Sequence, residues 1–377
     1  MQAIFLYKPD VVQYDYGTLH PFRLERLWLA DYLCEALGLF NGPDRVKRSF
    51  ESATREDLLG AHRAEYLDIL EAASQGIGAP GMVLHGLGSG DNPVFPGIWD
   101  YVLATVGGTL AAAEAIASGE TRRVFHIGGG LHHAHPERAA GFCYVNDVVV
   151  GIQRLLEHDL RVFYLDLDAH HGDGVERAFY QDRRVLTFSV HQDGRTLFPG
   201  SGFVNDVGFG DGAGFAVNVP LLPAMSDDSY RLIWDRLLVP LLDAFKPDLI
   251  VTELGADALQ GDPLAGLAMQ LRGWWELMER LARLGLPWLA VGGGGYDLAN
   301  AMRAWTLAWG AMVGWEPPDE LPPPPDELPG VAGSMRWPED FWSPTGAAPG
   351  LNPNGEITAA IIRQVRAAVF PHHNLSP

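Results

Sequence analysis

Six short, predominantly apolar runs constrain the fold of this chain more than any other feature. Each is rich in Val, Ile, Leu or Phe and is closely followed by Gly, Asp or His. The runs are Ala3–Tyr7, Val124–Ile127, Val162–Leu167, Val185–Val190, Leu249–Glu253 and Trp288–Val291. A strand that is apolar on both faces is typical of a sheet that is buried on both faces, as parallel sheets are. The pattern therefore predicts a mostly parallel central sheet.

Stretches with apolar residues at helical spacing alternate with these runs. The stretches are Phe22–Leu37, Gly97–Ala117, Asn146–Leu156, Asp227–Ala244, Leu267–Leu284 and Leu298–Val313. Strands that alternate with helices are typical of a sheet covered on both faces. The length of 377 residues would also allow two domains, but a large α/β unit can reach it alone. We therefore expect a single α/β domain, a three-layer α/β/α sandwich, over residues 1–315.

The composition changes after residue 315. Residues 316–329 read EPPDELPPPPDELP, and proline at this density excludes a helix or a central strand. We expect an extended surface segment there, followed by a helix over Glu356–Val369. This helix would pack on the same domain, and a loosely attached tail is the alternative.

Charge and composition exclude several classes of protein. The formal net charge is −20, and without a Lys/Arg-rich run we expect no nucleic-acid partner. The apolar N-terminal stretch is too short for a secretory signal, and no uncharged run is long enough to span a bilayer. Two cysteines, Cys34 and Cys143, cannot form a disulfide framework. We expect a cytoplasmic protein that does not bind membranes, and the sequence carries no sign of its oligomeric state.

Residues that suit a metal ion follow one of the predicted strands. In FYLDLDAHHGDG, residues 163–174, the side chains of Asp166, Asp168 and His170 alternate, so an extended chain points them to one side. The apolar residues before them indicate burial, and buried carboxylates need a cation or hydrogen bonds. The segment is therefore either part of a metal site or a structural polar cluster.

Asp257 follows a second predicted strand, in LIVTELGADALQGDP. On its own this residue is typical of a turn or a helix cap. Together with Asp168 and His170 it completes a set of two oxygens and one nitrogen. Such a set suits Zn²⁺ with an open fourth position, and Fe²⁺ or Co²⁺ are alternatives.

Glycine-rich turns after two further strands carry the other polar candidates. His132 and His133 follow three glycines. A hydrolytic metal site needs a base for the attacking water and an acid for the leaving group, and histidine can serve as either. Tyr296 follows the GGGG run, and its hydroxyl can donate to a developing oxyanion. A surface histidine pair and a tyrosine that caps the next helix are the structural alternatives.

Taken in order, six strings resemble the histone deacetylase family across residues 4–315. They are YGTLHPFRLER, GGGLHHAHPERAAGFCYVND, DLDAHHGDGVE, HQDGRTLFPGSG, GADALQGDP and GGGGYDLAN. Asp173, where other branches carry Asn, is similar to the class I branch and its bacterial relatives, the acetoin-utilisation deacetylases. The resemblance implies an arginase/deacetylase-type fold. It also implies zinc-dependent hydrolysis of the acetamide of N6-acetyl-lysine in proteins, with release of acetate.

The resemblance implies catalytic roles at the matching positions. The zinc ligands would be Asp168, His170 and Asp257. His132 and His133 would be the tandem catalytic histidines, oriented by Asp166 and Asp173 respectively. His133 would act as the general base that then protonates the leaving lysine, and Tyr296 would be the oxyanion donor.

Substrate-binding positions also follow from the resemblance. Phe142 and Phe198 would form the aromatic walls of an acetyl-lysine tunnel, and Leu264 would lie at its rim. The backbone of Gly141 would accept the substrate amide N–H. Asp91, in GSGDNP, would be the rim carboxylate that holds the substrate backbone.

Family members bind monovalent cations as well, and the resemblance implies two potassium sites. The first would use Asp166, Asp168, His170, Ser189 and Val190, several of them through backbone oxygens. The second would use the carbonyl oxygens of Phe179, Asp182, Val185 and Phe215.

One residue departs from the family pattern. Eukaryotic members carry Trp before the histidine pair, whereas this chain has Leu131. We expect Leu131 to reshape the pocket below the zinc and so to affect product exit. The acetoin-utilisation resemblance suggests an acetylated metabolic enzyme, such as an acyl-CoA synthetase, as the protein substrate.

Three other functions compete with lysine deacetylation. A binuclear manganese ureohydrolase would need Asp near two positions that are occupied by Gly172 and Leu259. An acetylpolyamine amidohydrolase would carry Asn at position 173 and a Pro-rich approach to the histidine pair. A non-catalytic acetyl-lysine-binding protein should have lost a ligand, a histidine or the tyrosine, and none is lost.

Overall fold

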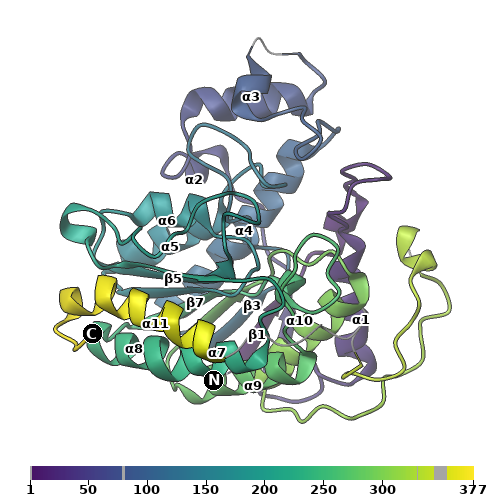
Figure 1. Ribbon diagram of the computed structural model, residues 1–377. Coiled ribbons are helices and arrows are strands. Elements are labelled where there is room, and N and C mark those ends of the chain that lie inside the picture. Colours follow the sequence, from purple (N-terminus) through teal and green to yellow (C-terminus); the bar gives the residue numbers. More distant parts are fainter. Residues whose placement is uncertain (1, 79–80, 329, 344–354) are drawn as a thin grey trace.

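A parallel sheet runs through the centre of the protein (Figure 1). The computed structural model describes residues 2–78, 81–328, 330–343 and 355–377. Within them the sheet has eight strands in the order β2-β1-β3-β8-β7-β4-β5-β6, and every neighbouring pair is parallel. The strands are β1 (Ala3–Leu6), β2 (Arg45–Arg48), β3 (Arg123–His126), β4 (Val162–Asp166), β5 (Val185–Gln192), β6 (Ala216–Leu221), β7 (Leu249–Glu253) and β8 (Trp288–Val291).

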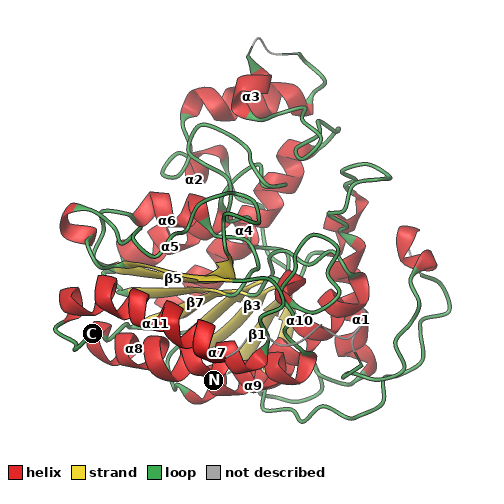
Figure 2. Cartoon of the chain, viewed as in Figure 1, coloured by secondary structure: helices red, strands yellow, loops and turns green. Residues whose placement is uncertain are grey.

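Helices cover both faces of the sheet, so the three-layer α/β/α prediction is confirmed (Figures 1 and 2). α4, α5 and α6 lie on one face, and α7, α8, α9 and α11 lie on the other; α10 packs against both α9 and α1. The helices are α1 (Glu25–Ala36), α2 (Arg55–Leu58), α3 (Ala64–Ser74), α4 (Ile98–Ala117), α5 (Asp147–Glu157), α6 (Asp173–Phe179), α7 (Asp227–Ile233), α8 (Val239–Phe245), α9 (Leu271–Arg283), α10 (Leu298–Met312) and α11 (Gly355–Val369).

The six predicted strands are present to within two residues at each end, but the two edge strands were missed. β2 reads RVKR and is only partly buried, so it shows no apolar run. β6 contains Pro220, which lacks a backbone N–H and is tolerated only where no partner strand needs one. Both strands lie at the ends of the strand order. Edge strands face a partner on one side only, and their sequences are correspondingly freer.

The helix predicted over Asp227–Ala244 is interrupted. α7 and α8 are joined by a π-helical turn, Trp234–Leu238. Pro240 follows immediately and offers no N–H to the carbonyl one turn earlier, so the regular i→i−4 ladder cannot continue through it. Periodicity alone could not show this break, because apolar spacing persists across it.

Strand register places four loops at one edge of the sheet. Asp166 pairs with Glu253, Glu253 with Val291, and Val291 with His126. The carboxyl ends of β4, β7, β8 and β3 are therefore level. In open α/β sheets this edge is where ligands bind.

Buried indoles join helix α10 to the end of β7, and β8 to β7, so they connect elements that carry these loops. Trp305 Nε1 donates to the Leu254 carbonyl oxygen at 2.9 Å, directly after β7. Trp288 Nε1 donates to Thr252 Oγ1 at 2.8 Å and joins β8 to β7. Both indoles are fully buried, so each hydrogen bond satisfies a donor that has no access to water.

The C-terminal region lies along the body of the protein. Residues 316–328 contain no helix, and an isolated bridge joins Glu320 to Asp340. Pro329, the end of the predicted extended segment, is outside the described residues. The buried Arg303 guanidinium donates to the carbonyl oxygens of Asp340 at 3.1 Å and Ser343 at 2.8 Å. These bonds hold residues 340–343 against α10.

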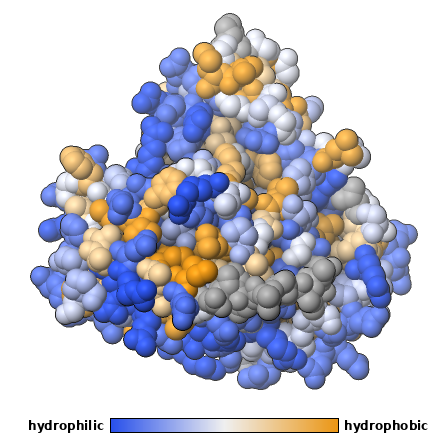
Figure 3. Space-filling view, in the orientation of Figure 1, coloured by the Kyte–Doolittle hydropathy of each residue, from blue (hydrophilic) through white to orange (hydrophobic). Residues whose placement is uncertain are grey.

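Helix α11 packs against α7 and β6. Its buried side chains include Ile362, Val365 and Val369, and Thr358 shares a 2.8 Å hydrogen bond with Ser229 of α7. The face shown in Figure 3 is hydrophilic over much of its outer and lower part, and hydrophobic residues lie across its middle and near its top. No helix in the described part of the chain combines the length and apolar character needed to cross a bilayer.

We predict that Ile362→Ala lowers the free energy of unfolding by about 2–5 kcal/mol, because it removes buried methyl groups and leaves a cavity. Chemical denaturation monitored by circular dichroism measures the change. Gln364→Ala, on the exposed side of the same helix, is the control and should stay within about 0.5 kcal/mol of the unaltered protein. Equal stabilities for the two variants would mean that α11 contributes nothing by packing.

Candidate active site

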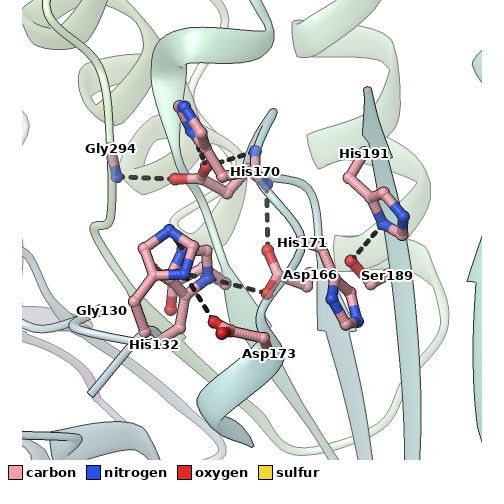
Figure 4. Close-up of polar contacts among 12 residues, drawn as sticks. Gly130, His132, Asp166, His170, His171, Asp173, Ser189, His191 and Gly294 are labelled. Carbon is pink, nitrogen blue, oxygen red and sulfur yellow. Dashed lines mark hydrogen bonds and ion pairs between the residues drawn. The ribbon is translucent and has the colours of Figure 1, made fainter. Parts of the chain in front are cut away.

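Side chains from the ends of β3, β4, β7 and β8 gather at one edge of the sheet. Figure 4 shows His132, Asp166, His170 and Asp173 grouped there, with the backbone of Gly294 beside them. The structure thus brings together residues that are up to 162 positions apart in the sequence, as counted from His132 to Gly294.

Asp168, His170 and Asp257 form a buried cluster whose donor atoms lie within 4.8 Å of one another. His170 Nδ1 is 3.0 Å from Asp168 Oδ1 and 2.9 Å from Asp257 Oδ2. Backbone N–H groups support both carboxylates. Gly294 donates to Asp168 Oδ2 and Ala169 donates to Asp257 Oδ1, each at 2.8 Å.

The charges of this cluster favour a cation. Burial, and then the charge of Asp168, raise the pKa of Asp257 to about 6. Despite its burial, hydrogen bonds to Asp168 and Asp257 raise the pKa of His170 to about 10. A positive charge is therefore favoured between the two carboxylates, and two oxygens with one imidazole nitrogen suit a divalent transition metal.

Two glycines make room for this cluster. A Cβ on Gly255 would lie 2.0 Å from Asp168 Oδ2, and one on Gly294 would lie 2.3 Å from Asp257 Oδ2. Any side chain at either position would displace a carboxylate. Gly294, in the GGGG run, therefore serves close packing around the donor set.

His132 and His133 each face a carboxylate and also face each other. His132 Nδ1 is 2.9 Å from Asp166 Oδ2, and His133 Nδ1 is 2.8 Å from Asp173 Oδ1. The two Nε2 atoms are 3.0 Å apart. A carboxylate can only accept a hydrogen bond, so the Nδ1 atom of each histidine carries a proton. The hydrogen bond between the two Nε2 atoms requires one further proton, on one of those two nitrogens. The pair therefore holds one positive charge.

That charge belongs on His132. Burial opposes it, but the charges of Asp166 and Asp168 raise the pKa of His132 well above its usual range. Burial and the charge of His132 lower the pKa of His133 to about 4, although Asp173 opposes this. His133 is thus neutral beside a charged His132, the state that a proton acceptor needs.

Asp147 holds the loop that carries the histidine pair. It accepts the backbone N–H of Leu131 at 2.8 Å and that of Gly130 at 3.1 Å, and Thr109 Oγ1 donates to it at 2.5 Å. Leu131 itself is buried. The sequence reading did not single out Asp147, although it lies in the quoted YVND string, since nothing local indicates which loop it supports.

Tyr296 is positioned through its backbone. Its N–H donates to Asp262 Oδ2 at 2.8 Å, and its ring centroid lies 6.3 Å from that of His170. Burial raises the pKa of the Tyr296 phenol well above its usual value, so the hydroxyl keeps its proton and can donate. Asp262 is a second residue that the sequence reading missed.

Two of the expected substrate-binding residues, Gly141 and Phe198, lie next to His133, and a third, Phe142, lies next to Tyr296. A Cβ on Gly141 would lie 2.4 Å from His133 Cδ2 and 2.9 Å from Phe198 Cε1, so only glycine fits between these rings. The Phe198 ring centroid is 5.0 Å from that of His133, and the Phe142 centroid is 5.6 Å from that of Tyr296.

The two expected rim residues are farther out. Asp91 is exposed, and its carbonyl oxygen accepts from His20 Nε2 at 3.2 Å. The His20 ring contacts that of Phe142 at 4.7 Å between centroids, which connects the Asp91 loop to this wall. Leu264 is partly buried, and its N–H donates to Asp262 Oδ1 at 2.9 Å.

The residues of the two expected potassium sites lie at opposite ends of β5. At its carboxyl end, Ser189 pairs with Asp166 of β4, and Ser189 Oγ is 2.8 Å from His191 Nδ1. Val190 follows there, beside the loop of Asp168 and His170. At its amino end, the carbonyl oxygens of three further residues already accept backbone N–H groups. The carbonyl of Phe179 accepts the N–H of Asp182, that of Asp182 accepts the N–H of Val185, and that of Phe215 accepts the N–H of Thr187.

Two more buried acid–base groups were not anticipated. His135 Nε2 shares Asp173 with His133, at 3.1 Å from Oδ2. Glu253 is fully buried near His132 and Asp168, and its carboxyl oxygens have no hydrogen-bond partner among the described residues. Burial raises the pKa of Glu253 well above its usual range. In the sequence Glu253 is only the last residue of an apolar run, and nothing there indicates a buried acid without a hydrogen-bond partner.

The chain is similar to characterised proteins over most of its length. Acetoin utilization protein AcuC of Bacillus subtilis (strain 168) is 38% identical over 330 residues, which cover 85% of this chain and 84% of that protein. Histone deacetylase 6 of Arabidopsis thaliana is 37% identical over 322 residues, 84% of this chain and 68% of that protein.

A solved structure has the same fold. The crystal structure of an HDAC homolog complexed with SAHA superposes with a TM-score of 0.86 at 27% identity, covering 97% of this chain and 100% of that one. The profile of the histone deacetylase domain matches residues 20–312. The resemblance seen in the six strings is confirmed, and this chain belongs to the histone deacetylase family of hydrolases.

Proposed function

We propose that this protein is a zinc-dependent lysine deacetylase that hydrolyses the acetamide of N6-acetyl-lysine in proteins and releases acetate. One observation carries the proposal. The Asp168–His170–Asp257 cluster lies beside a histidine pair whose Nε2 atoms are 3.0 Å apart, and both are buried at the carboxyl edge of the sheet. Membership of the histone deacetylase family supports the same chemistry.

Each polar group then has a task. When bound, a divalent cation supplies Lewis-acid chemistry, polarising the acetyl carbonyl and making a water acidic near neutral pH. His133 Nε2 takes a proton from the attacking water and later gives it to the leaving lysine amine. Asp173 keeps the His133 ring in the required orientation and tautomer. Tyr296 donates its hydroxyl to the oxyanion that forms at the acetyl carbonyl.

The proposal also includes the identity of the metal, of the monovalent cations and of the substrate. Zn²⁺ is our choice of metal, and Fe²⁺ suits the same donors. Potassium at the carboxyl end of β5 would stabilise the loop of Asp168 and His170, and potassium at its amino end would stabilise the segments that precede β5 and β6. An acetylated metabolic enzyme, such as an acyl-CoA synthetase, is the proposed substrate, on the strength of the similarity to an acetoin utilization protein. Acetylpolyamine hydrolysis is the second candidate, because the same acid–base groups would serve it.

We predict that the purified protein deacetylates an acetyl-lysine peptide and loses this activity on treatment with a chelator. Added Zn²⁺ should restore turnover, and elemental analysis should find one metal ion per chain. Acetylputrescine, assayed in parallel, distinguishes the polyamine alternative. A chelated enzyme that remains fully active would contradict the metal-dependent proposal.

We predict that Tyr296→Phe lowers kcat by about 10²–10³-fold, since it removes one oxyanion donor. KM should change little, because the ring and its contact with Phe142 remain. Steady-state kinetics on the acetyl-lysine peptide measure both constants. Wild-type turnover by this variant would show that the hydroxyl takes no part.

We predict that Asp173→Asn lowers kcat by about 10²-fold or more, because His133 loses the carboxylate that orients it as a general base. Asp235→Asn is the matched control. It removes an exposed carboxylate that pairs with Arg280, on the other face of the sheet, and should leave kcat unchanged. If both variants keep normal turnover, Asp173 has no role in proton transfer.

A further inference from the structure

Gln192, the last residue of β5, makes three hydrogen bonds to three different segments. It is buried, with 5% of its surface exposed. Its backbone N–H donates to the Ala169 carbonyl oxygen at 2.9 Å. Its side-chain Nε2 donates to Thr196 Oγ1 at 3.1 Å, and Oε1 accepts the backbone N–H of Gly266 at 2.7 Å.

Each of these segments carries a residue of the site. Ala169 lies between Asp168 and His170 of the buried cluster. Residues 193–202, the wall loop, contain Thr196 and Phe198, and residues 262–266, the rim loop, contain Leu264 and Gly266. One buried amide therefore connects the cluster, the wall loop and the rim loop.

Other contacts fix each loop to the body without joining the two loops to each other. The wall loop returns to the site at Ser201, whose Oγ is 2.9 Å from His171 Nδ1; His171 appears in Figure 4. The rim loop is held by Asp262, which accepts the N–H groups of Leu264 and Tyr296. Thr196 and Phe198 are exposed, and Thr196 also donates its N–H at 2.8 Å and its Oγ1 at 2.9 Å to the Asp193 carbonyl oxygen. The Gln192 amide therefore acts on the turn that precedes Phe198.

The contact with the rim loop leaves little room for adjustment. A Cβ on Gly266 would lie 3.2 Å from Gln192 Oε1, a tight approach that any other residue would crowd. A neutral amide suits this position. It donates to one loop and accepts from the other at once, and it carries no charge that burial would penalise.

We propose that Gln192 is a positioning residue that sets the separation of the wall loop and the rim loop, and thereby selects acetyl over longer acyl groups. The inference rests on the proposed function, because Phe198 and Leu264 bound the substrate only if an acyl-lysine is bound there. Phe198 is 44% exposed and its ring contacts His133, so a shift of the wall loop alters the space next to the acyl group.

The test compares acetyl-lysine and butyryl-lysine peptides of identical sequence with the full-length enzyme. In Gln192→Leu both side-chain bonds are lost. We expect KM for the acetyl peptide to rise about tenfold and the acetyl-over-butyryl ratio of kcat/KM to fall about tenfold. The value of kcat for the acetyl peptide should remain close to that of the unaltered enzyme, because no acid–base group is touched.

Thr196→Val provides a second, milder variant in an exposed loop. It removes the wall-loop partner of the Gln192 amide, together with the Oγ1 bond to the Asp193 carbonyl oxygen, and leaves the Gln192–Gly266 bond intact. The same two changes should therefore appear with smaller size. This variant decides the question if Gln192→Leu does not fold. Gln153→Leu is the matched control, since it removes another glutamine amide that joins two segments, here through a bond from Nε2 to the Gly60 carbonyl oxygen far from the site. It should change neither constant.

The outcomes separate the two proposals. If the unaltered enzyme turns over neither peptide, the proposed function fails. If it deacetylates the acetyl peptide while both variants keep its KM and acyl preference, the role of Gln192 is overturned. A fall in kcat alone, equal for both peptides, would also overturn it, because it would indicate general damage and not a change of loop separation.

Discussion

Two carboxylates held away from water are the constraint on which this structure depends. Asp168 and Asp257 come from different strands and meet around His170 Nδ1. Burying two like charges is costly unless hydrogen bonds and a cation compensate. The loops around them are shaped by this need. Gly255 and Gly294 leave space that a Cβ would fill, and backbone N–H groups point at the carboxylate oxygens.

The same need for compensation organises the histidine pair. Asp166 and Asp173 each face one Nδ1, and the contact between the two Nε2 atoms then admits only one further proton. The structure thereby makes two chemically identical side chains unequal: His132 holds the charge and His133 is left neutral. Because both residues are histidines, this difference arises from their surroundings and not from the side chains themselves.

The side chains proposed to contact the substrate lie on loops beyond the strand ends. Phe142 and Phe198 lie on such loops, and each contacts a residue distant in the sequence, Tyr16 and His133 respectively. Tyr16 donates to the Phe142 carbonyl oxygen at 3.0 Å, for example. Rigid strand ends can thus keep the chemistry constant while the loop contacts tune what enters. Gln192 matters in this arrangement because it belongs to a strand end and reaches both kinds of segment.

The sequence by itself determined the six buried strands, the alternation with helices, and the placement of Asp166, Asp168 and His170 after one strand, because apolar periodicity and residue spacing are local properties. It did not show the edge strands, whose residues are under weak burial constraints, and apolar periodicity carried the predicted helix past Pro240 although proline is a local signal for a break. Only the tertiary structure decided which distant groups serve the site. Asp147, Glu253 and Gln192 look ordinary in their own segments, and their roles arise from strand register, which brings separate loops to one edge.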